Sequence, residues 1–174
     1  MSRFGASSCG VQQSQEYGIA PNMKDPRTNV GIGGVLQTGR ELRVLEAIEL
    51  DEFAGYRFDA PLDVSLRIRR AGPGLDLHGT ISGVAEGTCA RCLDDVRFPL
   101  TVDVEERFDP PSENDDPLGE SNVLAGDELD LQDLVRQLVD SALPIVLLCH
   151  EDCTGLCTKC GFKADPICRC TPPE

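Results

Sequence analysis

Cysteine is the residue type in this chain whose spacing most clearly indicates chemistry. Of nine cysteines, two form a Cys-x-x-Cys pair mid-chain and six crowd the C-terminus as Cys-x3-Cys, Cys-x-x-Cys-Gly and Cys-x-Cys. Four thiolates make a closed tetrahedral zinc site, so eight suffice for two structural sites with no position open for a substrate. The eight grouped residues are Cys89, Cys92, Cys149, Cys153, Cys157, Cys160, Cys168 and Cys170.

We predict that these sulfurs divide into one local site and one long-range site, each holding a structural zinc ion. The last four cysteines can close a small loop, whereas the remaining two pairs would tie the middle of the chain to its end. His150 is a substitute ligand for the long-range site, and iron is the alternative metal because it also accepts four thiolates. The predicted ligands are Cys157, Cys160, Cys168 and Cys170 in the local site, and Cys89, Cys92, Cys149 and Cys153 in the long-range site.

Two other interpretations of the cysteines stay open. They could be reduced thiols without metal, or Cys89 and Cys92 could be the redox pair of a thiol-disulfide oxidoreductase, with Arg91 lowering a thiol pKa. A thioredoxin-like pair begins a helix in a βαβ unit, however, whereas Cys89 lies between two predicted antiparallel strands. The sequence also contains neither a Gly-x-Ser-x-Gly nor a His-Glu-x-x-His motif. We therefore predict a noncatalytic protein with no small-molecule substrate.

The sequence shows no sign of export or membrane insertion. No stretch approaches the roughly 20 apolar residues that span a bilayer. The segment from Met1 to Asn29 lacks the apolar run of a signal peptide. We expect a cytoplasmic protein, away from membranes, where thiols stay reduced and closely spaced cysteines are more often metal ligands than disulfides.

The charge of the chain indicates the chemistry of a partner. The net charge is −14, and nine carboxylates with no Lys or Arg fall between Asp109 and Asp133. Such a chain is a poor general phosphate binder and attracts a basic partner instead. Several arginines could nevertheless form a local basic strip that binds RNA. The alternative interpretation is that they are ordinary solubilising charges on an exposed sheet face. The candidate RNA contacts are Arg67, Arg69 and Arg70, with Arg91 and Arg97 on neighbouring strands.

Alternating apolar residues predict a sheet. Strict alternation over 62–69 predicts a half-buried strand, the turn at 71–74 leads to a second strand over 75–83, and 96–104 is a third. The period over 41–50 does not distinguish helix from strand. The apolar run 145–148 predicts a short buried strand or extended segment.

Residues from Leu131 to Ala142 place apolar side chains at steps of three and four, which predicts an amphipathic helix. Asp130 is its expected N-cap and Pro144 its expected stop. The fold class is therefore α+β. We expect an antiparallel sheet or partly open barrel covered by one amphipathic helix, with a Cys-rich C-terminal zinc-binding tail.

We divide the chain into three parts on composition. Residues 1–38 are rich in Ser, Gln, Gly and Asn and predict a flexible N-terminal extension. Residues 39–148 form the predicted core domain, which contains an acidic linker at 109–130. Residues 149–174 form the Cys-rich tail, which we expect to pack on the core.

Taken in order, these motifs closely resemble the YceD-like family of large ribosomal RNA subunit accumulation proteins. The resemblance spans about residues 40–170. It rests on the alternating sheet, the acid-rich linker and the Leu-rich helix, together with the motifs Cys89 to Leu93, Leu143-Pro144, Gly155-Leu156-Cys157 and Cys160-Gly161. The N-terminal extension departs from the family pattern.

The resemblance implies a role in accumulation of large-subunit ribosomal RNA, through its processing or through subunit assembly, and no enzymatic activity. Members are often encoded beside a zinc-ribbon protein of the large subunit, which implies a ribosomal protein or pre-ribosomal particle as partner. Not all members carry the tail from Cys157 to Cys170, so the resemblance implies that this site is an accessory. We expect binding of a basic ribosomal protein by the acidic linker, with RNA contacted secondarily.

Overall fold

The computed structural model describes residues 28–111, 122–124, 126–163 and 170 of the chain. Two sheets form among them: five strands in the order β2-β3-β4-β5-β6, and a two-stranded sheet of β1 and β7. The elements in chain order are β1 (Asn29–Gly31), α1 (Gly33–Thr38), β2 (Leu42–Ile48), β3 (Leu62–Ala71), β4 (Gly74–Thr88), β5 (Asp95–Asp109), β6 (Asn122–Val123), β7 (Glu128–Asp130) and α2 (Leu131–Ala142).

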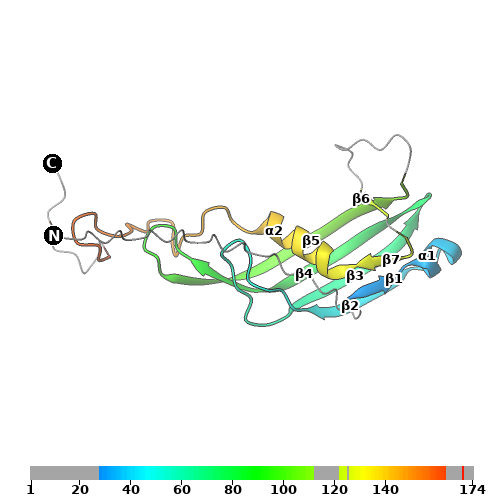
Figure 1. Ribbon diagram of the computed structural model, residues 1–174, viewed down its shortest axis with the longest axis horizontal. Helices are drawn as coiled ribbons and strands as arrows, with labels where there is room; N and C mark the ends of the chain where they lie inside the picture. Colours follow the sequence, from blue (N-terminus) through cyan, green and yellow to red (C-terminus); the bar gives the residue numbers. More distant parts are fainter. Residues whose placement is uncertain (1–27, 112–121, 125, 164–169, 171–174) are drawn as a thin grey trace, which may run out of the picture.

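The three central strands form where the sequence alternates. Antiparallel pairing joins β3 to β4 through the turn at Gly72, whose positive φ of 61° suits glycine. Strands β4 and β5 pair over fourteen successive positions, from Leu75 with Phe108 to Thr88 with Asp95. The predicted strands over 75–83 and 96–104 are thus the centre of a longer hairpin (Figure 1).

The core lies on one face of the large sheet. Along β3 the even-numbered residues from 62 to 68 are buried, whereas the odd-numbered residues are exposed. Helix α2 lies over the buried face (Figure 1) and contributes buried apolar side chains to the same core. These α2 residues are Leu131, Leu134, Val135 and Val139.

The ends of α2 agree with the sequence. The Asp130 side chain accepts a hydrogen bond from the backbone N–H of Asp133 at 3.1 Å, which satisfies one of the free donors at the helix start. The helix ends at Ala142, two residues before Pro144. The sequence therefore identified both the cap and the stop.

Three expectations need correction. The large sheet is open, so the alternative of a partly open barrel is wrong. It is not purely antiparallel, because β6 pairs with β5 in parallel at Phe108 and Asp109. The run 145–148 is not a strand and is buried only in part: Ile145 is fully exposed, whereas Leu147 packs against the core.

The predicted flexible extension also ends earlier than residue 38. Strand β1 pairs with β7, and α1 follows it directly. Ile32 between them is completely buried, and its N–H donates to the Asp127 carbonyl at 2.8 Å. Residues 29–38 belong to the folded domain because they cover the core beside α2. Residues 1–27 of the predicted extension and half of the predicted acidic linker lie outside the described residues.

Candidate metal centre

The first Cys-x-x-Cys pair occupies the turn between β4 and β5. Cys89 donates its backbone N–H to the Asp94 carbonyl at 2.8 Å, and Leu93 donates to the Cys89 carbonyl at 3.0 Å. Leu93 adopts a positive φ of 63°, which lets the chain reverse within the pair. The turn therefore holds both sulfurs at the tip of a long, rigid hairpin.

Backbone hydrogen bonds bring the C-terminal cysteines to this tip. Ala90 donates to the Leu147 carbonyl at 2.8 Å, and Leu156 donates to the Arg91 carbonyl at 3.2 Å. The Arg91 guanidinium also donates to the Cys153 carbonyl at 2.9 Å. Arg91 therefore positions the segment that carries Cys153, a role that its place in the Cys-x-x-Cys motif did not reveal.

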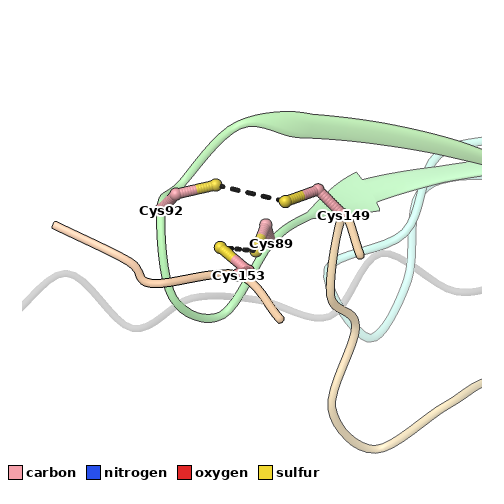
Figure 2. Close-up of side chains that lie close together, drawn as sticks. All are labelled: Cys89, Cys92, Cys149 and Cys153. Carbon is pink, nitrogen blue, oxygen red and sulfur yellow. Dashed lines mark hydrogen bonds between the residues drawn. The ribbon is translucent and has the colours of Figure 1, made fainter. Parts of the chain in front are cut away.

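Four sulfurs meet at the hairpin tip (Figure 2). The Sγ atoms of Cys89 and Cys153 are 3.9 Å apart, those of Cys92 and Cys149 are 3.6 Å apart, and all four lie within 4.8 Å of one another. A tetrahedral zinc site with zinc–sulfur bonds of about 2.3 Å places its sulfurs about 3.8 Å apart. Disulfide sulfurs would be about 2.05 Å apart, so these thiols are not cross-linked. The group could hold one metal ion.

Three of these four cysteines are buried and Cys149 is the exposed one. The imidazole Nδ1 of His150 lies 3.0 Å from the Cys149 sulfur. His150 is therefore placed where it can contact a ligand sulfur from outside the group. Four sulfurs are enough for a tetrahedral zinc site without it.

Backbone amides tune the thiols of the turn. Donation from the N–H groups of Cys92 and Arg91 lowers the pKa of the Cys89 thiol to about 6, against the opposing effect of burial. The Asp94 amide acts to lower the pKa of Cys92, but burial and the neighbouring thiols raise that pKa to about 12. Four neighbouring thiolates repel one another unless a cation lies between them. A metal ion bound there would displace the protons that remain on the thiols.

The second Cys-x-x-Cys pair repeats the geometry of the first. Cys157, Cys160 and Cys170 bring their sulfurs within 4.8 Å of one another. Gly161 has a positive φ of 73° and donates to the Cys157 carbonyl at 2.8 Å, and the Lys159 amide donates to the Cys157 sulfur at 3.4 Å. This group could also hold a metal ion.

The predicted fourth ligand of that site, Cys168, lies outside the described residues. Its membership in the local site therefore stays a prediction. The two groups of sulfurs are nevertheless separate, because no cysteine belongs to both.

An ion pair joins the second turn to the first. Lys163 contacts the Asp94 carboxylate in the β4–β5 turn, and a backbone bridge pairs Lys163 with Leu156. The Lys163 ammonium holds the pKa of Asp94 below its usual value. This contact was not predictable from the sequence, since charged partners so far apart in the chain have no shared period.

The predicted RNA contacts do not form a continuous basic strip. Arg69 is paired with the Glu41 carboxylate at 2.6 Å, and the Arg70 side chain donates to the Gly72 carbonyl at 3.2 Å. Arg97 pairs with Asp59 at 2.9 Å. Arg67 and Arg70 are exposed, and neither makes an ion pair within the described part of the chain. RNA contact through these residues stays a prediction.

Within the described residues, no helix is long and apolar enough to cross a bilayer. The pair Cys89 and Cys92 lies in a hairpin turn and not at the start of a helix, so its setting gives no support to the oxidoreductase alternative.

The sequence of this chain is similar to those of several known proteins. The family model described as "Large ribosomal RNA subunit accumulation protein YceD" matches residues 77–171, a range that contains all eight grouped cysteines. An uncharacterized protein of Mycobacterium tuberculosis is 34% identical over 120 residues, which cover 67% of this chain and 55% of that protein. An uncharacterized protein of Mycobacterium leprae is 27% identical over 135 residues, covering 74% of this chain and 60% of the relative. The chain thus spans little more than half the length of these relatives, and no solved structure matches it.

Proposed function

This chain belongs to the YceD family, and we propose that it is a noncatalytic factor that promotes accumulation of large-subunit ribosomal RNA. The observation that carries the proposal is the family match, because the matched segment contains the β4–β5 hairpin tip and both groups of cysteines. The chemistry proposed for this segment is structural: metal ions would hold a surface in place and would not transform a substrate.

We propose two structural zinc ions as part of this function. The long-range ion would be held by Cys89, Cys92, Cys149 and Cys153, whose closest sulfur pairs are spaced as zinc requires. The local ion would be held by Cys157, Cys160, Cys168 and Cys170. Each zinc ion would link the chain segments that carry its cysteines. The turns of the protein would direct backbone N–H groups at the sulfurs. Four thiolates also accept iron, so metal identity is settled by elemental composition.

The proposed partner is a basic protein of the large subunit or a pre-ribosomal particle. A net charge of −14 favours a cationic partner over a polyanion. Pairing of Arg69 with Glu41 and of Arg97 with Asp59 removes free charge from the side that we expected to contact RNA. Direct RNA contact through Arg67 is therefore secondary to protein binding. We propose a cytoplasmic location, because the proposed partners are ribosomal and thiols that bind a metal must stay reduced.

A genetic complementation experiment tests the function. Removing the gene from its host should lower the ratio of large-subunit to small-subunit ribosomal RNA, and the full-length gene should restore it. A Cys89→Ser gene should fail to restore the ratio, because the long-range site loses a ligand. Cys9→Ser is the matched control, since Cys9 belongs to neither group, and it should restore the ratio fully. An unchanged ratio after gene removal would contradict the proposed function.

A further inference from the structure

Strand β2 forms one edge of the large sheet. It pairs with β3 over its whole length, from Leu42 with Ile68 to Ile48 with Leu62. Among the described residues no strand is hydrogen-bonded to its other side. Seven residues extend over roughly 23 Å and leave alternate N–H and C=O groups unpaired. Such a row is a template for an added strand.

The opposite edge of the sheet is only partly covered, and its ladder of donors is interrupted. Strand β5 is covered by β6 at Phe108 and Asp109. Farther along, Pro99 lies within the β5 ladder and has no N–H to offer to a further strand. Strand β2 contains no proline between Leu42 and Ile48. Of the two edges, only β2 keeps its full set of backbone donors.

A hollow runs beside the C-terminal half of β2. It has a volume of about 480 Å³ and is lined by residues of β2 and by Thr28, Pro61 and Gln132. Gln132 of α2 also lines a smaller adjoining hollow that contains Asp51 and Phe53. Space for the side chains of an added strand therefore exists between β2 and the start of α2.

The charge of this edge specifies what can occupy it. Val44 and Ile48 are buried on the core side of β2, but Glu46 between them is exposed and lines the hollow. Glu49 lies beside it, and neither carboxylate has an ion-pair partner within the described residues. A carboxylate on the inner side of an edge strand rejects an apolar strand, whereas an opposed cation is favourable.

We propose that the free edge of β2 binds an extended, lysine- and arginine-rich protein segment as an added strand. The backbone of β2 would supply the ladder hydrogen bonds, and Glu46 and Glu49 would receive the cationic side chains. The identity of the partner as a ribosomal protein rests on the proposed function, whereas the binding mode rests on the edge, the hollow and the carboxylates. RNA does not fit this edge, because its phosphates would face Glu46 and Glu49.

The test uses the purified full-length chain and a short fluorescent peptide that alternates lysine with valine. The peptide should bind at low ionic strength and weaken as salt is added. Glu46→Gln combined with Glu49→Gln should reduce affinity about tenfold, since each exposed charge contributes modestly. The matched control is Asp103→Asn combined with Glu105→Gln on exposed positions of β5, which removes equal charge from the other side of the sheet and should leave affinity nearly unchanged.

Two further measurements separate strand addition from general charge attraction. A peptide of the same sequence with alternate backbone nitrogens methylated should not bind, because it lacks the ladder donors. Hydrogen exchange should show new protection at alternate amides of 42–48 when the unmodified peptide binds. Equal loss of affinity in both double variants, equal binding of the methylated peptide, or protection elsewhere would overturn the proposal.

This test is independent of the cellular role. If the peptide binds at β2 but removal of the gene does not change ribosomal RNA, the docking edge is supported and the proposed function is wrong. A normal ribosomal RNA effect without peptide binding would retain the function and reject the docking edge.

Discussion

Leu93 and Gly161 occupy equivalent positions in the two cysteine turns. Each follows the second cysteine of a Cys-x-x-Cys pair, each has a positive φ, and each donates its N–H to the carbonyl of the first cysteine. The two turns thus share one backbone design, although glycine fits the left-handed conformation and leucine does not. The long-range site keeps a strained, largely exposed leucine at this position.

Replacing that leucine should reveal the strain. Leu93→Gly removes a left-handed penalty of about 1–2 kcal/mol and adds up to about 1 kcal/mol of chain entropy cost. We expect the free energy of unfolding to stay constant or rise by up to about 1 kcal/mol in urea titrations at fixed zinc concentration. The matched variant Leu93→Val should lower it, because a β-branched side chain tolerates this conformation less well. Destabilisation by glycine that exceeds that by valine would refute the strain argument.

The local site should be the part of the chain that depends most on its own metal. Cys157→Ser removes one predicted ligand from the second turn, while the group of four cysteines at the β4–β5 turn stays complete. We expect limited proteolysis to cleave within 157–174 and to leave the β4–β5 hairpin intact, since metal-binding free energy there is folding free energy. The comparison is with Cys9→Ser, which should resist protease like the unmodified chain. Equal resistance of the two variants would mean that the turn folds without a metal.

Gly79 lies at the centre of β4, where the neighbouring strand approaches closely. A Cβ at this position would overlap the carbonyl oxygen of Ser65 on β3, and backbone atoms cannot rotate away. We expect Gly79→Ala to lower the free energy of unfolding by at least about 2 kcal/mol, measured by urea denaturation. Gly34→Ala in α1 is the control, because no atom lies within 4 Å of its Cβ and alanine favours a helix. Equal effects at both positions would contradict the close approach.

Glu41 provides a test of the charge arrangement on the sheet. Hydrogen bonds from Arg69 and then Arg43 hold the pKa of the Glu41 carboxyl below its usual value. Because the folded pKa is lowered, the stabilisation is present above the unfolded pKa and is lost as the pH falls through the folded pKa. NMR titration of the carboxyl should therefore show a low pKa that rises toward the reference value in Arg69→Ala. An unshifted pKa in the unmodified chain would mean that Arg69 is free to meet an anion.

The elements with periodic apolar residues or local end signals were predicted from the sequence. The elements whose order depends on contacts with distant residues were not. Alternation located β3, β4 and β5, and Asp130 with Pro144 located the ends of α2, because these signals are local. Residues 29–38 looked flexible, since short apolar residues among glycines have no period. Burial of Ile32 against the core makes that segment ordered, and only the tertiary structure shows it.

The same contrast holds at the metal centre. Cysteine count and spacing predicted that Cys89 and Cys92 would meet Cys149 and Cys153, because four thiolates are needed to complete one site. The supporting contacts of Arg91 and Lys163 were not predictable, since a single charged residue can serve many roles. The ion pair of Arg69 with Glu41 was not predicted either, because Glu41 lies just before β2 and meets Arg69 only through the pairing of Leu42 with Ile68.

Metal content per chain, measured by elemental mass spectrometry on protein purified without added metal or chelator, is the decisive test of two structural metal sites. We expect two zinc ions in the unmodified chain and in Cys9→Ser, and one zinc ion in Cys89→Ser and in Cys157→Ser, because each variant opens a different site. A metal-free chain, or two ions retained in either ligand variant, would contradict the assignment of two separate four-cysteine sites.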